Sequence, residues 1–185
     1  DELVGQDTAI EQLRQAARAT DTGGASAAMT HAWLITGPPG SGRSNAARAF
    51  AAALLSPDRG ESRSPAAQRA LAGTHESMTI MATQKSLITI DEVRELVSQA
   101  QSAPVNAPWR VMIIEDADRM AERTSNVLLK AIEEPPPATV LILCAPSPQD
   151  VLTTIRSRCR PVTLRVPPVE AVAELLARRD GVAAA

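Results

Sequence analysis

Residues 37–44 read Gly-Pro-Pro-Gly-Ser-Gly-Arg-Ser and carry the strongest chemical signal in the sequence. Their spacing matches a phosphate-binding loop, in which backbone N–H groups surround phosphate oxygens and the N-terminus of the next helix adds positive potential. Ser44 stands where the hydroxyl of such a loop binds magnesium. The candidate phosphate-binding residues are Gly37, Gly40, Gly42, Arg43 and Ser44.

Arg43 occupies the position at which this loop normally carries a lysine. A lysine is a slim point charge that reaches the β- and γ-phosphates, whereas the arginine guanidinium is a broad planar fork and does not replace it in a tight loop. Three interpretations follow for this degenerate Walker A motif. The loop is a retained structural turn, a weak nucleotide site without turnover, or a working ATPase site.

A second candidate site follows the apolar residues 111–114, where the chain continues with Glu115 and Asp116. Working ATPases of this type place an Asp first, to hold magnesium, and a Glu second, to orient the attacking water. The order is reversed here, so that Glu115 is one methylene too long for the metal position and Asp116 is one too short to position water. Because a misplacement of ~1 Å can cost ~100-fold in rate, we interpret the pair as a degenerate Walker B motif. Alternatively, both acids are simply solvated at the end of a strand.

Five short apolar segments predict buried strands, and helical patterns alternate with them. The strands are expected at 32–36, 78–81, 110–114, 139–144 and 161–166. Helices are expected from the phosphate loop to Leu55, after a capping box at Thr89–Glu92, and at 122–133 before three prolines. This alternation predicts an α/β fold with a parallel five-stranded sheet covered by helices on both faces. Residues 56–75 are expected to form an exposed insertion.

Composition and charge narrow the class of protein. The 185 residues suffice for one buried α/β domain with a small appendage, and a net charge of −2 argues against a broad basic face that binds nucleic acid unaided. No apolar run approaches the ~18 residues of a membrane span, so we expect a cytoplasmic protein without a membrane partner. With two cysteines, Cys144 and Cys159, the chain cannot hold a four-thiolate zinc ion, and no disulfide is expected in a reducing compartment.

Five motifs together resemble the clamp-loader subunits of bacterial DNA polymerase III, which are AAA+ proteins. They lie at 3–7, 37–44, 114–118, 128–136 and 157–159. The Leu-Leu-Lys-Ala-Ile-Glu-Glu-Pro-Pro run and the Ser-Arg-Cys triplet are specific to clamp loaders, and the resemblance covers nearly the whole chain. It implies a P-loop AAA+ domain at 1–166, followed at 167–185 by the start of a small helical lid domain. Because the chain opens at Asp1 without a methionine and closes on a helical pattern at 169–179 with nothing to pack against, we expect an N-terminal fragment of a longer protein that has a further C-terminal domain.

Three departures from the motor subunit of that family imply the delta-prime type. The motor has an intact loop lysine, an Asp-Glu pair and a polar sensor residue after the fourth strand, where this chain has Arg43, Glu115-Asp116 and Ala145-Pro146. The resemblance therefore implies a stator subunit that helps load the sliding clamp onto DNA in replication without hydrolysing ATP itself. It would be part of the DNA polymerase III holoenzyme, a nucleotidyltransferase complex. The alternative is an ATP-hydrolysing gamma/tau-type motor subunit or another AAA+ ATPase.

In that family, the arginine of the Ser-Arg-Cys triplet is donated to ATP on the neighbouring motor subunit. Carried over to this chain, Arg158 is expected to be a catalytic arginine finger acting in trans. Alternatively, Arg156, Arg158 and Arg160 decorate the entry to a strand and face solvent. The implied partners are the gamma/tau motor and delta subunits of the clamp loader and, through them, the sliding clamp and primer-template DNA.

The family usually carries four cysteines after the phosphate-loop helix, and these hold a structural zinc ion. The best alignment places Ser56, Glu61, Ser64 and Ala67 at those positions, and this set cannot form a tetrahedral thiolate site. We therefore expect no metal site, and we expect His75 to be a surface histidine rather than a ligand. No cofactor is firmly implied, because the binding of magnesium and ATP stays open for the degenerate loop.

Overall fold

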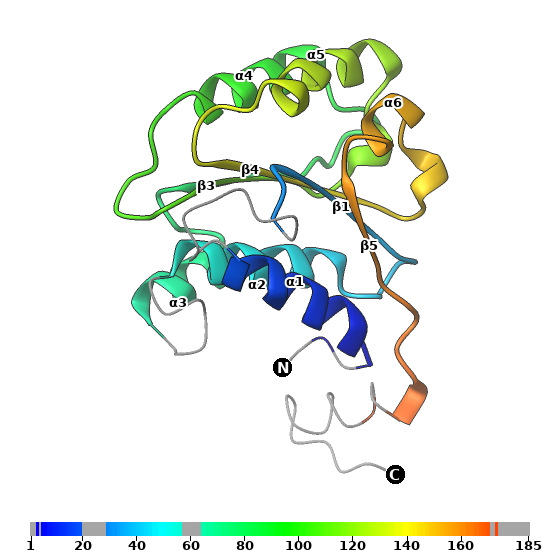
Figure 1. Ribbon diagram of the computed structural model, residues 1–185. Coiled ribbons are helices and arrows are strands. Elements are labelled where there is room, and N and C mark those ends of the chain that lie inside the picture. Colours follow the sequence, from blue (N-terminus) through cyan, green and yellow to red (C-terminus); the bar gives the residue numbers. More distant parts are fainter. Residues whose placement is uncertain (1–2, 4, 20–28, 57–63, 171–172, 174–185) are drawn as a thin grey trace.

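A parallel sheet of five strands lies between two layers of helices in the computed structural model (Figure 1). The structure describes residues 3, 5–19, 29–56, 64–170 and 173. The strands are β1 (Ala32–Thr36), β2 (Met78–Met81), β3 (Arg110–Ile114), β4 (Thr139–Ala145) and β5 (Arg160–Thr163). Their order is β2-β3-β4-β1-β5, and every neighbouring pair is parallel. The predicted α/β fold with a parallel five-stranded sheet is confirmed.

The helices divide between the two faces of the sheet (Figure 1). One face is covered by α1 (Asp7–Ala19), α2 (Arg43–Leu55) and α3 (Pro65–Ala72). The other is covered by α4 (Ile90–Ala100) and α5 (Glu122–Glu133), with the short α6 (Thr153–Arg156) packed against α5. The 3-10 turns η2 (Ala117–Arg119) and η3 (Pro148–Asp150) lie in the connections. Because all strands run the same way, the sheet has an amino edge, where strands begin, and a carboxyl edge, where they end.

Successive strand residues feed two separate hydrophobic clusters, one on each face of the sheet. In β1, Trp33 and Ile35 join the cluster beneath α1, α2 and α3, whereas Leu34 joins the cluster beneath α4 and α5. The Trp33 ring meets the Phe50 ring edge-on, with centroids 5.0 Å apart, and the Arg160 guanidinium lies 5.3 Å from the Trp33 centroid. Burial on both faces explains why the strands appear in the sequence as continuous apolar runs.

Local sequence signals set the ends of α4 and α5. The Thr89 hydroxyl accepts from the Glu92 N–H, and the Glu92 carboxylate accepts from the Thr89 N–H at 2.8 Å, so the predicted capping box is confirmed. This backbone hydrogen bond, helped by the Thr89 hydroxyl and Lys85, lowers the pKa of Glu92 to about 2. The last residue of α5 is Glu133, two residues before the prolines that lack the N–H groups needed to extend it.

The fifth strand is shorter than the predicted 161–166, because a side chain takes over its hydrogen bonding. The Gln6 amide donates to the Arg165 carbonyl at 2.7 Å and accepts from the Arg165 N–H at 3.0 Å. Beyond this point Val166 is 71% exposed. The chain therefore leaves the sheet at Arg165, whose backbone is hydrogen-bonded to Gln6 of the opening motif.

Residues 56–75 were expected to form an exposed insertion, whereas the part of this range that the structure describes holds a helix and buries several side chains. Ser56 is 1% exposed, and α3 packs on α2 and buries Ala67 and Ala70. Ser64 caps this helix by accepting from the Ala67 N–H at 3.2 Å, directly before a proline at the first helical position. The Pro- and Ser-rich composition suggested a loop, whereas these residues start a helix whose small side chains fit against the core.

His75 was expected on the surface, and this expectation is also wrong. The residue is 4% exposed, and its Nδ1 accepts from the Ser77 N–H at 3.0 Å. Its Nε2 is buried and makes no hydrogen bond to the described residues. Burial, and to a smaller degree the charge of Arg69, lowers the pKa of His75 below its usual 6.5. The packing of the segment before β2 thus holds the ring as a neutral imidazole.

Several sequence expectations concern residues that the structure does not describe. Of the lid expected at 167–185, residues 167–170 and 173 are described, whereas Val4 of the opening motif and Glu61 of the aligned zinc positions lie outside the described residues. No helix in the described ranges has both the length and the apolar character that crossing a membrane requires.

Cys144 and Cys159 are free and buried, as expected for unpaired thiols, and burial raises the pKa of each to about 12.

Candidate functional site

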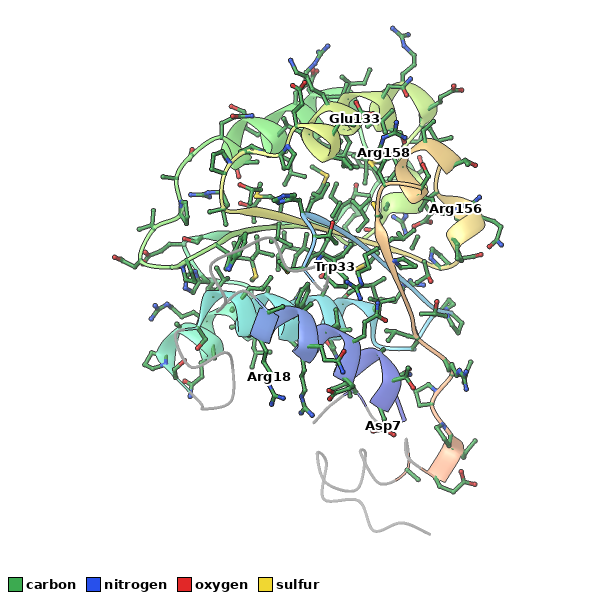
Figure 2. All side chains as sticks on the ribbon, in the orientation of Figure 1. Asp7, Arg18, Trp33, Glu133, Arg156 and Arg158 are labelled. Atoms are coloured by element: carbon green, nitrogen blue, oxygen red, sulfur yellow. The ribbon has the colours of Figure 1, made fainter. Side chains whose placement is uncertain are left out.

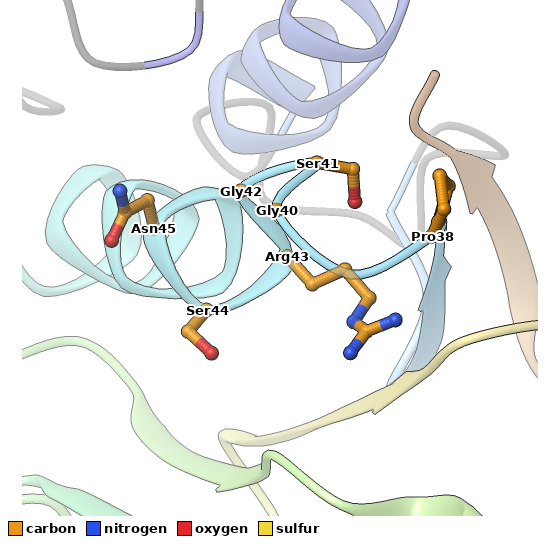
Figure 3. A pocket seen from close by; sticks show the side chains of 7 residues that line it. All are labelled: Pro38, Gly40, Ser41, Gly42, Arg43, Ser44 and Asn45. Atoms are coloured by element: carbon orange, nitrogen blue, oxygen red, sulfur yellow. The ribbon is translucent and has the colours of Figure 1, made fainter. Parts of the chain in front are cut away.

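The phosphate loop lies at the carboxyl edge of the sheet, between the end of β1 and the start of α2. Gly40 and Gly42 have φ angles of +81° and +89°, in the left-handed region that favours glycine. The loop borders an open cavity of about 310 Å³ (Figure 3). The residues that line it are Pro38, Gly40, Ser41, Gly42, Arg43, Ser44 and Asn45. The loop predicted from the sequence is therefore present, with Ser44 at its rim.

Gly37 sits at the tightest point of this loop. A Cβ atom there would lie 2.5 Å from the Ser41 hydroxyl oxygen, 2.9 Å from the Leu164 Cβ and 3.0 Å from the Leu164 carbonyl oxygen. The hydroxyls of Ser41 and Thr36 are buried and make no hydrogen bond within the described part of the chain. The loop is thus packed closely against the segment that leaves β5, and its shape depends on the absence of a side chain at Gly37.

Arg43 is bonded to the loop itself. Its Nη1 donates to the carbonyl oxygen of Gly37, and Figure 3 shows the side chain running back across the loop toward Pro38. A lysine at this position acts as a flexible point charge, whereas the guanidinium has a planar set of donors that a carbonyl can engage. The positive charge of Arg43 is therefore bonded in part to the backbone that surrounds the cavity.

Glu115, the first acid after β3, forms an ion pair with Arg48 of α2. Arg48 Nη2 lies 3.1 Å from Glu115 Oε1, and the two side chains are 33% and 16% exposed. The Arg48 Nε is buried and makes no hydrogen bond to any described residue. No motif in the sequence pointed to Arg48. The signal was available, because a lone charge in the alanine-rich part of a helix needs a partner when that helix is packed.

Asp116, the second acid, is held by the chain around it. One carboxylate oxygen accepts from the Thr83 N–H at 3.1 Å, and the other lies 3.8 Å from Arg119 Nε. Arg119 in turn donates to the carbonyl oxygens of Thr83 and Lys85 at 3.0 and 2.9 Å. Both acids after β3 thus have partners within the chain, and Asp116 joins the turn after β2 to the end of β3.

The end of β4 completes the carboxyl edge near the loop. Ala145 pairs in register with Thr36, the last residue of β1, and Pro146 follows. Neither Ala145 nor Pro146 has a side-chain group that can hydrogen-bond a phosphate. Cys144 lies 4.0 Å from the Arg43 carbonyl oxygen, and its raised pKa keeps it a neutral thiol. The position at which the family resemblance expects a polar sensor residue therefore carries no polar side chain.

Arg158 lies at the opposite edge of the sheet from the phosphate loop. It precedes β5 by two residues, at the amino edge, whereas the loop follows β1 at the carboxyl edge. In the pairing of β1 with β5, Trp33 lies opposite Arg160 and Thr36 lies opposite Thr163. The paired part of these strands therefore spans three residue steps, or roughly 10 Å, and Arg158 and the loop lie beyond its two ends. The structure brings Gly37, Arg43, Glu115 and their neighbours to one edge and leaves Arg158 outside this group.

Of the four positions aligned with the family's zinc ligands, the structure describes Ser56, Ser64 and Ala67, which lie together but do not fit a zinc ion. The hydroxyl oxygens of Ser56 and Ser64 lie 2.7 Å apart, and the Ala67 N–H donates to Ser64. Two hydroxyls and a methyl group supply no thiolate or imidazole, which structural zinc requires. Within the described ranges, no three His, Cys, Asp or Glu residues are grouped as metal ligands would be. A hydrogen bond between two serines joins α2 to the start of α3 here.

Comparison with known proteins assigns the family. The model of the family described as DNA polymerase III, delta subunit, matches residues 5–168. The chain belongs to this clamp-loader family. The subunit delta' of Pseudomonas aeruginosa is 34% identical over 163 residues, which cover 84% of this chain and 49% of that protein. The subunit gamma/tau of Mycobacterium tuberculosis is 32% identical over an alignment of 189 residues, which covers 96% of this chain and 30% of that protein.

The chain thus spans about a third to a half of the length of these relatives, and its identity to the two kinds of subunit is similar. Among solved structures, a DNA polymerase III gamma subunit-related protein of Thermotoga maritima has a TM-score of 0.66 at 24% identity, covering 90% of this chain and 49% of its own. RuvB of the same organism has a TM-score of 0.61 at 17% identity, covering 95% and 50%. These likenesses show an AAA+ P-loop fold.

Proposed function

We propose that this chain belongs to a stator subunit of the delta-prime kind, which does not hydrolyse ATP and which completes the ATP site of a neighbouring motor subunit with Arg158. Its partners would be the gamma/tau and delta subunits of a cytoplasmic clamp loader, acting on the sliding clamp and primer-template DNA. The observation that supports this proposal most directly is the internal bonding of the phosphate site. Arg43 is bonded to Gly37, Glu115 to Arg48, and Asp116 to Thr83.

A magnesium nucleotide does not fit these residues. A carboxylate at the end of β3 must be free to bind the metal, and a second must orient the attacking water. For Glu115 to do either, it would have to leave Arg48, and a partly buried guanidinium would then lose its partner. The reversed order of the two acids and the apolar Ala145 add to this misfit. We therefore propose that the loop is retained as a structural turn.

The position of Arg158 supports action in trans. Arg158 precedes β5 at the amino edge of the sheet, whereas the chain's own phosphate loop follows β1 at the carboxyl edge, and the paired strand residues between them alone span roughly 10 Å. Arg158 is also 42% exposed, so that a neighbouring subunit can reach it. An arginine supplied across an interface stabilises the charge that develops on the γ-phosphate in the transition state.

The test is titration calorimetry of the full-length protein with magnesium-ATP, together with phosphate release, for the wild type and for Arg43→Lys. We expect neither binding heat nor turnover from the wild type. We expect no turnover from Arg43→Lys either, because Glu115 and Asp116 keep their partners in that variant. Magnesium-dependent hydrolysis by the wild type would overturn the proposal.

The alternative function is an ATP-hydrolysing motor subunit of the gamma/tau kind. It is favoured by the match to the Mycobacterium tuberculosis gamma/tau subunit over 96% of this chain. That function predicts micromolar nucleotide binding with turnover by the isolated protein. It also predicts that removing the Glu115 carboxylate abolishes the turnover.

A further inference from the structure

One side of the Arg158 guanidinium is bound within the chain, and the other side is open. Its Nε lies 2.7 Å from Glu133 Oε1, and its Nη1 donates to the Thr154 carbonyl oxygen at 2.9 Å. The Ser157 hydroxyl lies 3.4 Å from the same Nη1. Within the described part of the chain, Nη2 has no partner. The guanidinium is therefore anchored at Nε and Nη1, while the two N–H donors of Nη2 stay available to solvent or to a neighbouring subunit.

Glu133 offers a rigid anchor for this arrangement. It is the last residue of α5, and α6, which leads to Arg158, packs against α5. Figure 2 shows Glu133 and Arg158 side by side at this end of the helix. A carboxylate in the last turn of a helix opposes the helix dipole, so its presence here is not explained by helix stability. The contact with Arg158 gives the carboxylate a partner of opposite charge.

We propose that Glu133 is a positioning residue for Arg158. The inference rests on the proposed function of Arg158 as an arginine donated to a neighbour. A free arginine side chain samples many rotamers, and holding it in one orientation before the neighbour docks reduces the entropy lost in the transition state. With Nε bound to Glu133, the guanidinium presents its Nη2 end to the phosphate of the neighbouring subunit.

The expected effect is modest because both side chains are about half exposed. An exposed ion pair contributes little free energy, so losing this one should change the rate of ATP hydrolysis by about 2- to 5-fold. The carboxylate also repels a nearby triphosphate, and this repulsion acts in the opposite direction. Solvent and salt screen it over roughly 10 Å. If positioning dominates, Glu133→Gln lowers the rate of ATP hydrolysis by the assembled complex. If repulsion dominates, the same substitution raises that rate.

The test uses the full-length protein assembled with the motor subunits of its own clamp loader. ATP hydrolysis is measured for Glu133→Gln, for Arg158→Ala and for the double variant. Glu134→Gln is the matched control, because it removes the same charge from the adjacent exposed position. We expect Glu133→Gln to lower kcat by about 2- to 5-fold with little change in KM, and Glu134→Gln to leave both unchanged. In the Arg158→Ala background, Glu133→Gln should have no further effect.

A second measurement reports on the contact itself. Hydrogen exchange of the Arg158 Nε–H, followed by NMR in the full-length protein without partners, should be slowed in the wild type and in Glu134→Gln. It should be fast in Glu133→Gln. This signature separates a held guanidinium from a general loss of structure, since a merely destabilised fold would speed exchange at many sites.

The outcomes separate the two proposals. If Arg158→Ala leaves hydrolysis by the complex unchanged, the proposed function of Arg158 fails and the positioning role fails with it. If Arg158→Ala abolishes hydrolysis but Glu133→Gln is neutral or faster, the positioning role alone is overturned. The same holds if Glu133→Gln is equally harmful in the Arg158→Ala background, or if the Nε–H exchange does not depend on Glu133.

Discussion

The two edges of the sheet use their charged residues in opposite ways. At the carboxyl edge, Arg43, Arg48, Glu115 and Asp116 each have a partner in the chain, and the loop that they surround is intact. At the amino edge, Arg158 is bound on one side and open on the other. The first edge has the shape of a phosphate-binding site whose charged side chains are paired within the chain, and the second has an exposed guanidinium that is ion-paired at Nε and keeps Nη2 available.

On the proposed function, this difference means that the phosphate loop persists for its shape while the charged side chains around it have become structural. The loop backbone joins β1 to α2 and packs against the chain that follows β5, so that losing it would disturb several elements. The charged side chains around it are separable from this role. We therefore expect the carboxyl edge to matter for stability and the amino edge for the activity of the assembled complex.

The largest expected effect contrasts the two edges directly. In the complex with motor subunits, Arg158→Ala should lower the rate of ATP hydrolysis at the adjoining site by ~10³-fold or more, because a transition-state charge loses its partner. Arg43→Gln should leave that rate unchanged, and so should Arg94→Ala, which removes an exposed, ion-paired arginine elsewhere. Steady-state phosphate release measures all three. A comparable loss of rate in Arg43→Gln would show that the carboxyl edge also contributes to ATP hydrolysis by the complex.

The next prediction concerns the shape of the loop. Gly37→Ala forces a Cβ against the Ser41 hydroxyl and the backbone of the segment after β5, and should destabilise the fold by about 3 kcal/mol. Gly40→Ala meets no atom within 4 Å, so the strain of its positive φ is its main effect, at about 1 kcal/mol. Urea unfolding of the two variants measures this difference. Equal midpoints would show that the loop is not required for packing.

The ion pair at the carboxyl edge gives a smaller effect. Arg48→Met leaves Glu115, 16% exposed, without its partner and should lower the unfolding free energy by about 1–2 kcal/mol after allowance for partial solvation. Arg94→Met, at an exposed pair with Asp91, should change it by less than about 0.5 kcal/mol. Thermal unfolding of both variants is the measurement. A neutral Arg48→Met would mean that Glu115 is free to act on a ligand.

The smallest effect is the pH dependence that His75 confers near the amino edge of β2. The folded-state pKa of His75 lies below 6.5, so the unfolded chain binds the proton more readily, and protonation favours unfolding. The stability linked to His75 is therefore present above about pH 6.5 and is lost as the pH falls from there toward the folded-state pKa. Urea midpoints between pH 7.5 and 5 should decline less steeply in His75→Gln. An unchanged slope would contradict this assignment.

Much of the fold could be predicted because its signals are local. The apolar runs at 32–36, 110–114 and 139–144 specify buried strands, and the Thr89–Glu92 pair specifies a helix start within four residues. The end of β5 could not be predicted in this way. It depends on Gln6, which is 159 positions away from Arg165 in the sequence and beside it in the structure.

The difference between local signals and long-range contacts also explains why the sequence predictions for the residues before β2 differ from the structure. Ser, Pro and Ala residues after α2 looked like a surface segment, because composition does not reveal that α2 offers them a surface to pack on. His75 looked like a surface residue for the same reason. Whether a residue is buried depends on which elements pack over it, and no local pattern in this segment recorded that packing.

The sequence by itself determined the phosphate loop, the reversed acidic pair and the Ser-Arg-Cys triplet, because each is a short run whose spacing carries the chemistry. It also determined the alternation of strands and helices that produces a parallel sheet. The tertiary structure alone decided that Arg48 neutralises Glu115, that Arg43 bonds Gly37, and that Glu133 holds Arg158. These contacts join side chains from different elements, so their geometry exists only after the sheet and its helices have packed together.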